Sequence, residues 1–246
     1  MDGDIVIEIG AGPGIITGEL LKKSHKVIAF EIDKNLFNKL LEKFSDHKSL
    51  DLRLGSFLTY SLPSYPYKVF SNIPFNITSD VVKKLALSEN PPEDTYLIIQ
   101  KEAAGKFMGM TVDNKNSLVA ILLKPWFDFE VFYQFKQNDF FPKPGVNAIM
   151  LRMKKKGKPL ININQKSLFE DFVAYSFNQV KPKIKPGKID FNEWLKLFDI
   201  FVKEPEESRQ KIVGFYSKLK KQQEQLEKIH RTRVDKNWKR TGFTLC

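Results

Sequence analysis

The stretch IVIEIGAGPG, residues 5–14, decides the fold. It opens with an apolar, β-branched run typical of a buried strand and closes on alternate glycines, Gly10, Gly12 and Gly14. Glycine permits a tight turn and lets the backbone approach a ligand closely. Helical spacing follows over 15–24. The order strand, glycine turn, helix predicts an α/β domain that binds a ligand at the carboxyl end of its first strand.

Strand and helix patterns alternate after this stretch. Apolar runs predict strands over 26–33, 50–58, 67–73 and 95–100, with helices over 36–44 and 81–87 between them. Such alternation predicts a parallel sheet with helices on both faces.

An acidic residue, Glu31, stands at the end of the second predicted strand, seventeen residues after Gly14. A carboxylate there would accept hydrogen bonds from both hydroxyls of a ribose. NAD would suit this layout, but the pyrophosphate pattern G-x-G-x-x-G is missing because the third glycine comes one residue early. The shorter turn suits a cofactor without a pyrophosphate, such as S-adenosylmethionine. A tight turn with no ligand is the alternative interpretation.

The stretch SNIPFNITSD, residues 71–80, places an amide, a proline and an aromatic ring where an apolar strand ends. One group that such a turn could hold is the exocyclic amine of adenine, a weak nucleophile that needs orientation more than a strong base. The Asn72 side-chain oxygen and the Ile73 carbonyl could accept hydrogen bonds from the two N–H groups of this amine, while Pro74 stiffens the turn. Phe75 offers a face on which the base can stack.

The alternative for this stretch is an ordinary strand-to-helix turn, with Thr78 or Ser79 capping the helix.

Four segments, EIGAGPG, FEID, SNIPFN and FFPKPGVNAIMLRM, occur in the order and at the spacing in which one protein family has its conserved motifs. Through these segments the chain resembles the ribosomal RNA adenine N6-dimethyltransferases. The resemblance extends from Ile5 to about Phe201. The resemblance implies an S-adenosylmethionine-binding, Rossmann-like α/β domain and a small C-terminal helical domain. The corresponding divisions are 1–155 for catalysis, 160–205 for the small RNA-binding helical domain, and 206–246 for a basic helix and tail.

The resemblance also implies the site residues, position by position. Phe140, in FFPKP (140–144), would cover the other face of the target base, although core packing is the alternative for this ring. No metal is implied. The catalytic set is Asn72, Ile73, Pro74, Phe75 and Phe140. The cofactor set is Glu8, Gly10, Ala11, Gly12, Gly14, Glu31, Ile32, Ser56, Phe57 and Asn72.

Two branches of the family compete. Isoleucine after the asparagine in SNIPFN, together with DFNEWLKLFDIF (190–201) and LEKIHRTR (226–233), favours the Erm-type branch. That branch methylates an adenine of large-subunit (23S) ribosomal RNA and gives resistance to macrolides, lincosamides and streptogramin B. The alternative is the branch that modifies small-subunit ribosomal RNA. The exact nucleotide and the number of methyl groups stay open.

Two departures from the family pattern bear on activity. Ser56 stands where the family has an acid that meets the adenine of the cofactor, so weaker cofactor affinity is expected. The chain enters its first strand at once, so the family's N-terminal Gln-Asn-Phe segment, which closes over the cofactor, is expected to be absent. A catalytically inactive RNA-binding relative is therefore a further alternative.

The positive charge is concentrated in the second half of the chain. Residues 155–246 hold 21 Lys+Arg against 11 Asp+Glu, a balance of +10, and residues 1–154 hold 19 against 18, a balance of +1. A polyanion such as ribosomal RNA would bind there, with a merely solvated surface as the alternative. Helical spacing marks 168–177 and 192–201. KPKIKPGK (181–188) between them is an expected cationic loop, and a long solvated helix followed by a basic tail is expected from Glu206 onward.

Composition bears on the cellular compartment, on metal binding and on membrane insertion. The only cysteine is Cys246, which excludes an internal disulfide and favours the cytoplasm. The three histidines lack metal-ligand spacing. No apolar run approaches the roughly 20 residues that span a bilayer. A monomer acting on ribosomal RNA, without a membrane, is expected.

Overall fold

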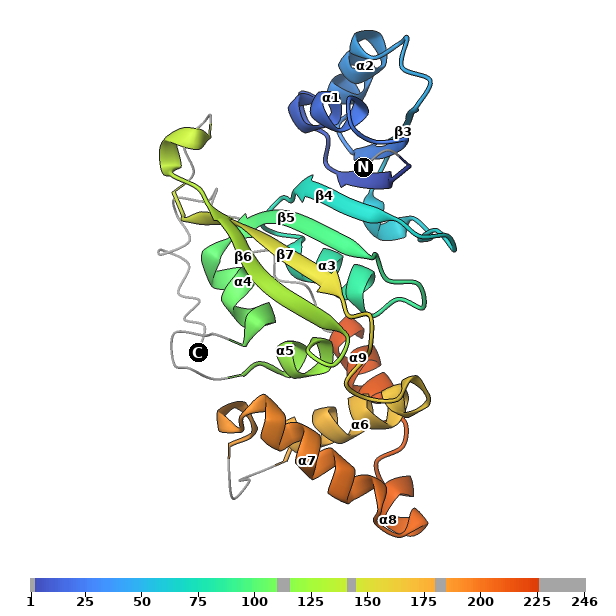
Figure 1. Ribbon diagram of the computed structural model, residues 1–246, viewed down its shortest axis with the longest axis vertical. Coiled ribbons are helices and arrows are strands. Elements are labelled where there is room, and N and C mark those ends of the chain that lie inside the picture. Colours follow the sequence, from blue (N-terminus) through green and yellow to red (C-terminus); the bar gives the residue numbers. More distant parts are fainter. Residues whose placement is uncertain (1–2, 110–115, 141–144, 180–184, 226–246) are drawn as a thin grey trace.

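A seven-stranded sheet organises the chain in the computed structural model, which describes residues 3–109, 116–140, 145–179 and 185–225 (Figure 1). The strands lie side by side in the order β3-β2-β1-β4-β5-β7-β6. Their bounds are β1 Ile5–Ile9, β2 Lys26–Glu31, β3 Leu50–Leu54, β4 Lys68–Asn72, β5 Asp94–Gln100, β6 Phe127–Gln134 and β7 Ala148–Lys155.

The sheet is mixed. Strands β1 to β5 pair in parallel, whereas β7 runs antiparallel to both β5 and β6. The prediction of a parallel sheet is therefore confirmed for the five strands that it named, β1 to β5. The antiparallel strands β6 and β7 are an addition that the sequence-based prediction did not include.

Helices cover both faces, as predicted. Helices α1 (Ile15–Leu21) and α2 (Lys34–Lys43) pack on β2 and β3 through a small core that includes Val27, Ala29 and Leu40. Asp33 begins α2, because its carboxylate accepts hydrogen bonds from two backbone N–H groups of the first turn. The other face carries α3 (Thr78–Ala86), α4 (Lys101–Met108) and α5 (Leu118–Leu123).

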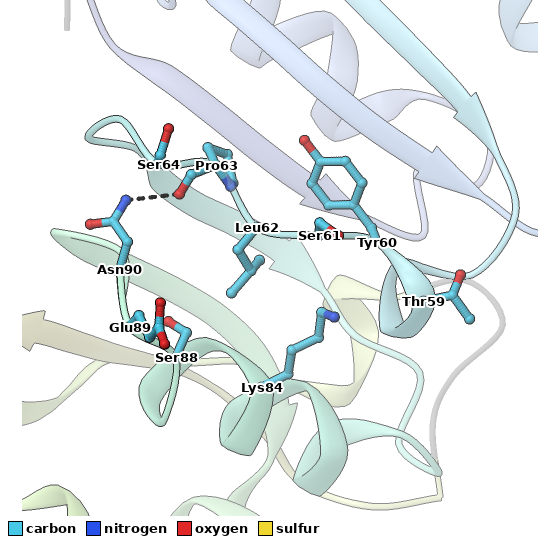
Figure 2. Close-up of a pocket in the computed structure, with 10 residues that line it drawn as sticks. All are labelled: Thr59, Tyr60, Ser61, Leu62, Pro63, Ser64, Lys84, Ser88, Glu89 and Asn90. Atoms are coloured by element: carbon cyan, nitrogen blue, oxygen red, sulfur yellow. Dashed lines mark hydrogen bonds between the residues drawn. The ribbon is translucent and has the colours of Figure 1, made fainter.

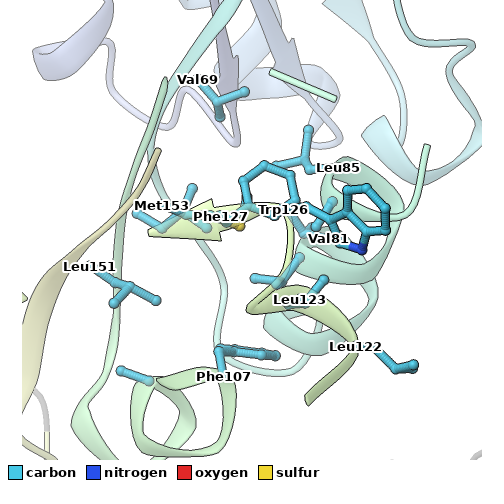
Figure 3. Packing of buried hydrophobic residues seen from close by; sticks show 14 of the residues in the cluster. Val69, Val81, Leu85, Phe107, Leu122, Leu123, Trp126, Phe127, Leu151 and Met153 are labelled. Atoms are coloured by element: carbon cyan, nitrogen blue, oxygen red, sulfur yellow. The ribbon is translucent and has the colours of Figure 1, made fainter. Parts of the chain in front are cut away.

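The main core lies between the sheet and these last three helices. Figure 3 shows Phe127, Leu151 and Met153 of the sheet beside Leu123 of α5 and Leu85 of α3. All five side chains are almost fully buried. Burying an aliphatic or aromatic side chain of this size stabilises a fold by about 1.5–3 kcal/mol, so this layer holds the sheet firmly against α3 and α5.

The C-terminal helices extend the same core. They are α6 (Lys166–Phe177), α7 (Phe191–Val202), α8 (Glu206–Gln210) and α9 (Phe215–Gln225). Helix α6 packs against α5 and α9, and its buried Phe169 and Val173 join Trp194 and Phe198 of α7 in the main cluster. In Figure 1 these helices lie at the opposite end of the molecule from α1 and α2. The division of the chain near residues 155–160 stays a prediction.

The single long solvated helix expected from Glu206 is wrong. Helix α8 ends at Gln210, and Gly214 takes a left-handed conformation (φ 79°) before α9 begins. Ile212 and Tyr216 are buried. The buried carboxylate of Asp171, on α6, accepts hydrogen bonds from the N–H groups of Gly214 and Tyr216, both at 2.8 Å. This carboxylate fixes the corner, which charge patterning alone does not reveal.

In the part of the chain that the structure describes, no helix has the length and apolar character needed to cross a membrane.

Candidate functional site

The order in which successive strands are added to the sheet reverses between β1 and β4. From β1 the chain proceeds to β2 on one side, and from β4 to β5 on the other. Ligands of open α/β sheets bind in the crevice at the carboxyl ends of two such strands. The pairing of β1 with β4 ends at Ile7 and Val69, so the strands separate before their carboxyl ends. The predicted glycine turn and the SNIPF stretch lie at the two sides of this opening.

The glycine turn is held by the neighbouring strand β2. The N–H groups of Gly10 and Ala11 both donate to the carbonyl of Phe30, at 2.9 Å. Gly10, Gly12 and Gly14 all have positive φ angles (76°, 57° and 76°). At Gly14 a side chain is doubly excluded, because a Cβ would overlap Leu40 and Phe44.

The glycine turn also approaches the SNIPF stretch. A Cβ at Gly10 would lie 3.7 Å from the Cδ of Pro74, in ordinary contact. At Gly12 no atom of the described residues lies within 4 Å of such a Cβ, so the turn is open on that side. The structure thus brings the two motifs together.

Glu31 is buried at the end of β2 and joined to the glycine turn. Its Oε2 accepts from the N–H of Gly12 at 2.8 Å, and its Oε1 accepts from the N–H groups of Ile32 and Asp33 at 2.8 and 2.9 Å. A carboxylate has about four lone-pair sites, and these bonds use three of them. Glu31 therefore organises the loops at the sheet edge as well as offering an acceptor to a ligand. The predicted role of binding both ribose hydroxyls stays a prediction.

Glu8 lies beneath the glycine turn with 1% of its surface exposed. Its Oε2 accepts from the hydroxyl of Thr17, on α1, at 2.6 Å. Burial raises the pKa of the Glu8 carboxyl to about 7, against the lowering effect of the bonds to Thr17. Glu8 thus joins β1 to α1 from below, and its charge changes near neutral pH.

The remaining predicted cofactor residues follow β2 and β3. The Ile32 side chain is 72% exposed at the sheet edge, where it could cover an apolar ring. The Ser56 hydroxyl accepts from the N–H of Leu58 at 3.2 Å and begins the 3-10 turn Phe57–Thr59. The Phe57 ring is buried edge-on to Phe30, with centroids 5.4 Å apart. Only the backbone of Phe57 is left to contact a ligand.

The SNIPF stretch presents Asn72 to solvent on a rigid support. Asn72 ends β4 and is exposed, and among the described residues its side chain makes no hydrogen bond. The Ile73 side chain is buried and its N–H donates to the carbonyl of Ile98 at 3.2 Å. The Pro74 carbonyl accepts from the N–H of Ile77, and Phe75 is 42% exposed. Asn72 and Phe75 are thus free to meet a ligand, while Ile73 anchors the turn.

The alternative explanation of this turn, a cap from Thr78 or Ser79, is not what the structure has. Helix α3 begins without a side-chain cap, and the Thr78 hydroxyl donates back to the Pro74 carbonyl at 3.4 Å.

Phe140 lies beyond β6, at the same edge of the sheet. The pairing of Gln100 with Ala148 and of Gln134 with Ile149 places the end of β6 beside the carboxyl end of β5. The Phe140 ring is half-buried against Phe135, with centroids 5.1 Å apart. Among the described residues no ring contact joins Phe140 to Phe75. The rest of FFPKP, residues 141–144, lies outside the described residues.

A pocket of about 450 Å³ lies away from this edge, between residues 59–64 and the end of α3 (Figure 2). The Lys84 ammonium at its wall donates to the Leu58 carbonyl at 3.0 Å, and the Asn90 amide donates to the Pro63 carbonyl at 2.9 Å. None of the predicted site residues lines it. The crevice at the carboxyl ends, which carries the motifs, is therefore the better candidate site.

Two residues of the site carry no role in the sequence-based prediction. Thr17 holds Glu8, and Ser71 joins β4 to β1 where their pairing has ended. Ser71 stands inside the quoted SNIPF stretch, so a polar residue in an apolar strand was the available signal. For Thr17 the signal is weaker, because threonine is common in a first helical turn. Within the described residues no group of three or more His, Cys, Asp or Glu side chains is placed to hold a metal.

Comparison with known proteins gives a consistent result. The family model described as ribosomal RNA adenine dimethylase matches residues 2–228. The chain is 28% identical over 215 residues to an rRNA adenine N-6-methyltransferase of Limosilactobacillus reuteri, covering 80% of this chain and 85% of the relative. It is 26% identical over 216 residues to ribosomal RNA small subunit methyltransferase A of Listeria monocytogenes, covering 79% and 73%.

Among solved structures, that of the 23S rRNA methyltransferase ErmE superposes with a TM-score of 0.70 at 24% identity. The match covers 80% of this chain and 90% of that one. At this identity the superposition shows a shared fold.

Proposed function

The chain belongs to the ribosomal RNA adenine dimethylase family of S-adenosylmethionine-dependent methyltransferases, and we propose that it methylates the N6 amine of an adenine in 23S ribosomal RNA. Resistance to macrolides, lincosamides and streptogramin B would follow from methylation at the drug-binding site. One observation carries the proposed chemistry: the Asn72 side chain is exposed, with no hydrogen bond among the described residues, at the crevice where the glycine turn meets Pro74.

The residues at the crevice fit S-adenosylmethionine. The glycine turn is open beside Gly12, and Glu31 retains about one lone-pair site for a hydroxyl donor. Ile32 supplies exposed apolar surface next to it. Ser56 supplies an uncharged acceptor. When bound, the cofactor supplies a methyl group that is already strongly electrophilic.

The protein's task is then to orient the amine. The Asn72 side-chain oxygen accepts a hydrogen bond from one N–H of the adenine NH2 and so directs the nitrogen lone pair. The buried Ile73 and the turn through Pro74 keep that oxygen in place, while the exposed face of Phe75 stacks on the base. No strong base is needed, because the excess proton can pass to water after transfer. We assign to Phe140 the opposite face of the base.

The choice of 23S RNA rests on resemblance rather than on chemistry at the site. The Ile73 side chain is 1% exposed, so it cannot contact RNA. Isoleucine at this position therefore supports the 23S branch by resemblance alone. A second candidate, methylation of small-subunit RNA, is favoured by the similarity to the small subunit methyltransferase of Listeria monocytogenes.

The helical part would supply RNA affinity. Helix α9 exposes Lys218, Lys220 and Lys221, and protein cations on RNA bind mainly phosphates. In this proposal residues 1–155 carry out methyl transfer, while residues 160–205 and the basic segment after them hold the RNA. The target adenine must leave its stack to reach Asn72.

A methylation assay tests the proposal. The purified chain is incubated with methyl-labelled S-adenosylmethionine and either 23S or 16S RNA, and the modified position is mapped by primer extension. Methylation of 23S RNA alone is expected. Methylation of 16S RNA alone would establish the second candidate. If neither RNA is methylated although calorimetry shows cofactor binding, the enzymatic proposal fails and an RNA-binding relative remains.

A further inference from the structure

One asparagine joins the catalytic part of the molecule to the start of α7. Asn116 precedes α5, and its N–H donates to the Gly187 carbonyl at 2.6 Å. Its Nδ2 donates to the Ile189 carbonyl at 2.9 Å. Its Oδ1 accepts from the Lys124 ammonium at 2.9 Å. The amide can serve in only one orientation, because a flip would set donor against donor at Lys124 and acceptor against acceptor at Ile189.

The partner of Asn116 is itself fixed. The Lys124 ammonium lies 5.6 Å from the centre of the Phe191 ring, in the first turn of α7. Burial lowers the pKa of Lys124, while the nearby charge of Asp190 raises it. Lys124 therefore bridges α5 and α7, with the Asn116 amide as its neutral acceptor.

The base of the junction is equally constrained. Ser117 donates to the Lys106 carbonyl of α4 at 2.6 Å and accepts from the N–H of Ala120 in α5 at 3.0 Å. At Gly109, which ends α4 with a φ of 73°, a Cβ would overlap Asn116 Oδ1. Residues 116–117 thus connect α4, α5 and the segment 185–189 through side chains with little freedom.

This junction controls where two cations lie. Segment 185–189 contains Lys185 and Lys188, and in Figure 1 the start of α7 lies on the side of the molecule where β4 and β5 end. Helix α4 starts directly after β5, at that same edge, and its far end contacts the junction through Lys106. Asn116 therefore sets the distance between the carboxyl-end crevice and the two lysines.

We propose that Asn116, held by Lys124, is a positioning residue for the RNA substrate: it fixes segment 185–189 so that Lys185 and Lys188 meet phosphates while the target adenine reaches Asn72. This inference rests on the proposed function. Because the hydrogen bonds that Asn116 makes within the described residues go to Gly187, Ile189 and Lys124 and to no predicted cofactor residue, it acts on RNA binding and leaves methyl transfer unchanged.

The test compares Asn116→Ala with a matched control, Asn192→Ala. Asn192 lies in the first turn of α7, is exposed, and has no side-chain hydrogen bond among the described residues. Steady-state methylation gives KM for RNA and kcat, calorimetry gives the Kd of S-adenosylmethionine, and hydrogen exchange reports on the 185–189 peptide. Lys124→Met serves as the second variant if Asn116→Ala does not fold.

The expected result for Asn116→Ala is a rise in KM for RNA on the order of 10-fold, as for the loss of a half-buried hydrogen-bonded group. Its kcat and cofactor Kd should stay within 2-fold of the parent, with faster exchange confined to 185–189. Asn192→Ala should match the parent.

Two results would overturn the inference. One is faster exchange at 185–189 with an unchanged KM. The other is a joint change in kcat, cofactor affinity and exchange within the sheet, which would indicate general destabilisation. If the parent methylates no ribosomal RNA, the proposed function fails by itself. The dissociation constant for RNA, measured by filter binding, then replaces KM. If Asn116→Ala binds RNA as tightly as the parent, the inference is overturned.

Discussion

Ser71 and Ile9 exchange two hydrogen bonds across the opening between β4 and β1. The Ser71 hydroxyl donates to the Ile9 carbonyl at 2.5 Å and accepts from the Ile9 N–H at 3.3 Å. Regular pairing of these strands has already ended at Ile7 and Val69. One side chain therefore replaces the missing backbone bonds, so the strands can separate and form the crevice without leaving buried polar groups unpaired.

Ser71→Ala should lower the free energy of unfolding by about 2–4 kcal/mol, because a buried donor and a buried acceptor of Ile9 each lose their partner. Urea titration measures this. Ser64→Ala is the matched control, since Ser64 is exposed. A Ser71→Ala protein as stable as the Ser64→Ala protein would mean that water replaces the hydroxyl.

Asn72→Ala should reduce kcat by a factor on the order of 100 to 1000, the usual loss for one preorganised polar contact in a transition state. Cofactor affinity, measured by calorimetry, should fall far less than kcat, because Asn72 is only one of ten predicted cofactor residues. Asn76→Ala, an exposed asparagine in the same turn, should behave as the parent. Methylation at the parental rate by Asn72→Ala would show that another group orients the amine.

Glu31→Gln should weaken binding of S-adenosylmethionine by roughly 10- to 100-fold, because bonds to a charged acceptor contribute about 1.5–3 kcal/mol. Asp33→Ala is the control for loop order: it frees two N–H groups at the start of α2 and should cost about 1 kcal/mol of stability without changing cofactor affinity. Equal Kd values for the parent and Glu31→Gln would exclude the ribose role.

Glu8 makes stability depend on pH in a definite direction. Burial raises the pKa of Glu8 to about 7 from its ordinary value of 4.5, so the folded state binds a proton that the unfolded state releases between those values. Stability contributed by the neutral carboxyl is complete below pH 4.5 and falls as pH rises to 7, by on the order of 3 kcal/mol in total.

The measurement for Glu8 compares unfolding of the parent and Glu8→Gln at pH 5 and pH 8. Glutamine keeps an acceptor for Thr17 but does not titrate. Relative to the parent, Glu8→Gln should therefore be more stable at pH 8 than at pH 5. A difference independent of pH would mean that Glu8 stays charged in the folded protein.

The sequence predicts those features that local pattern determines. Apolar runs and glycine positions locate β1 to β5 and the crevice, since buried strands and positive φ angles leave compositional marks. The reversal of β7 and the buried corner at Gly214 could not be predicted in this way. They depend on partners distant in the chain: β7 on β5, and Gly214 on Asp171, 43 residues away. The roles of Ser71 and Asn116 are hidden for the same reason.

The fold shows which part of the basic C-terminal segment can be deleted to test its role in RNA binding. Removing everything after Glu206 would delete Ile212 and Tyr216, which are buried, and so damage the core. Deleting residues 226–246 leaves α9 intact and removes six cations: Lys228, Arg231, Arg233, Lys236, Lys239 and Arg240. Each phosphate neutralised contributes about 0.7–0.9 to the slope of log K against log salt.

If four of these six cations contact phosphates, the slope for RNA binding should flatten by about three units in the truncated chain. Cofactor affinity should not change, because Gly12, Glu31 and the other predicted cofactor residues lie before residue 76. The measurement is RNA binding over a salt series with the full chain and the truncation. As a matched control, changing Lys218, Lys220 and Lys221 of α9 to glutamine removes exposed charge without shortening the chain. Equal slopes for the full and truncated chains, with a flatter slope for the α9 variant, would place the phosphate contacts on the folded helices and not on the tail.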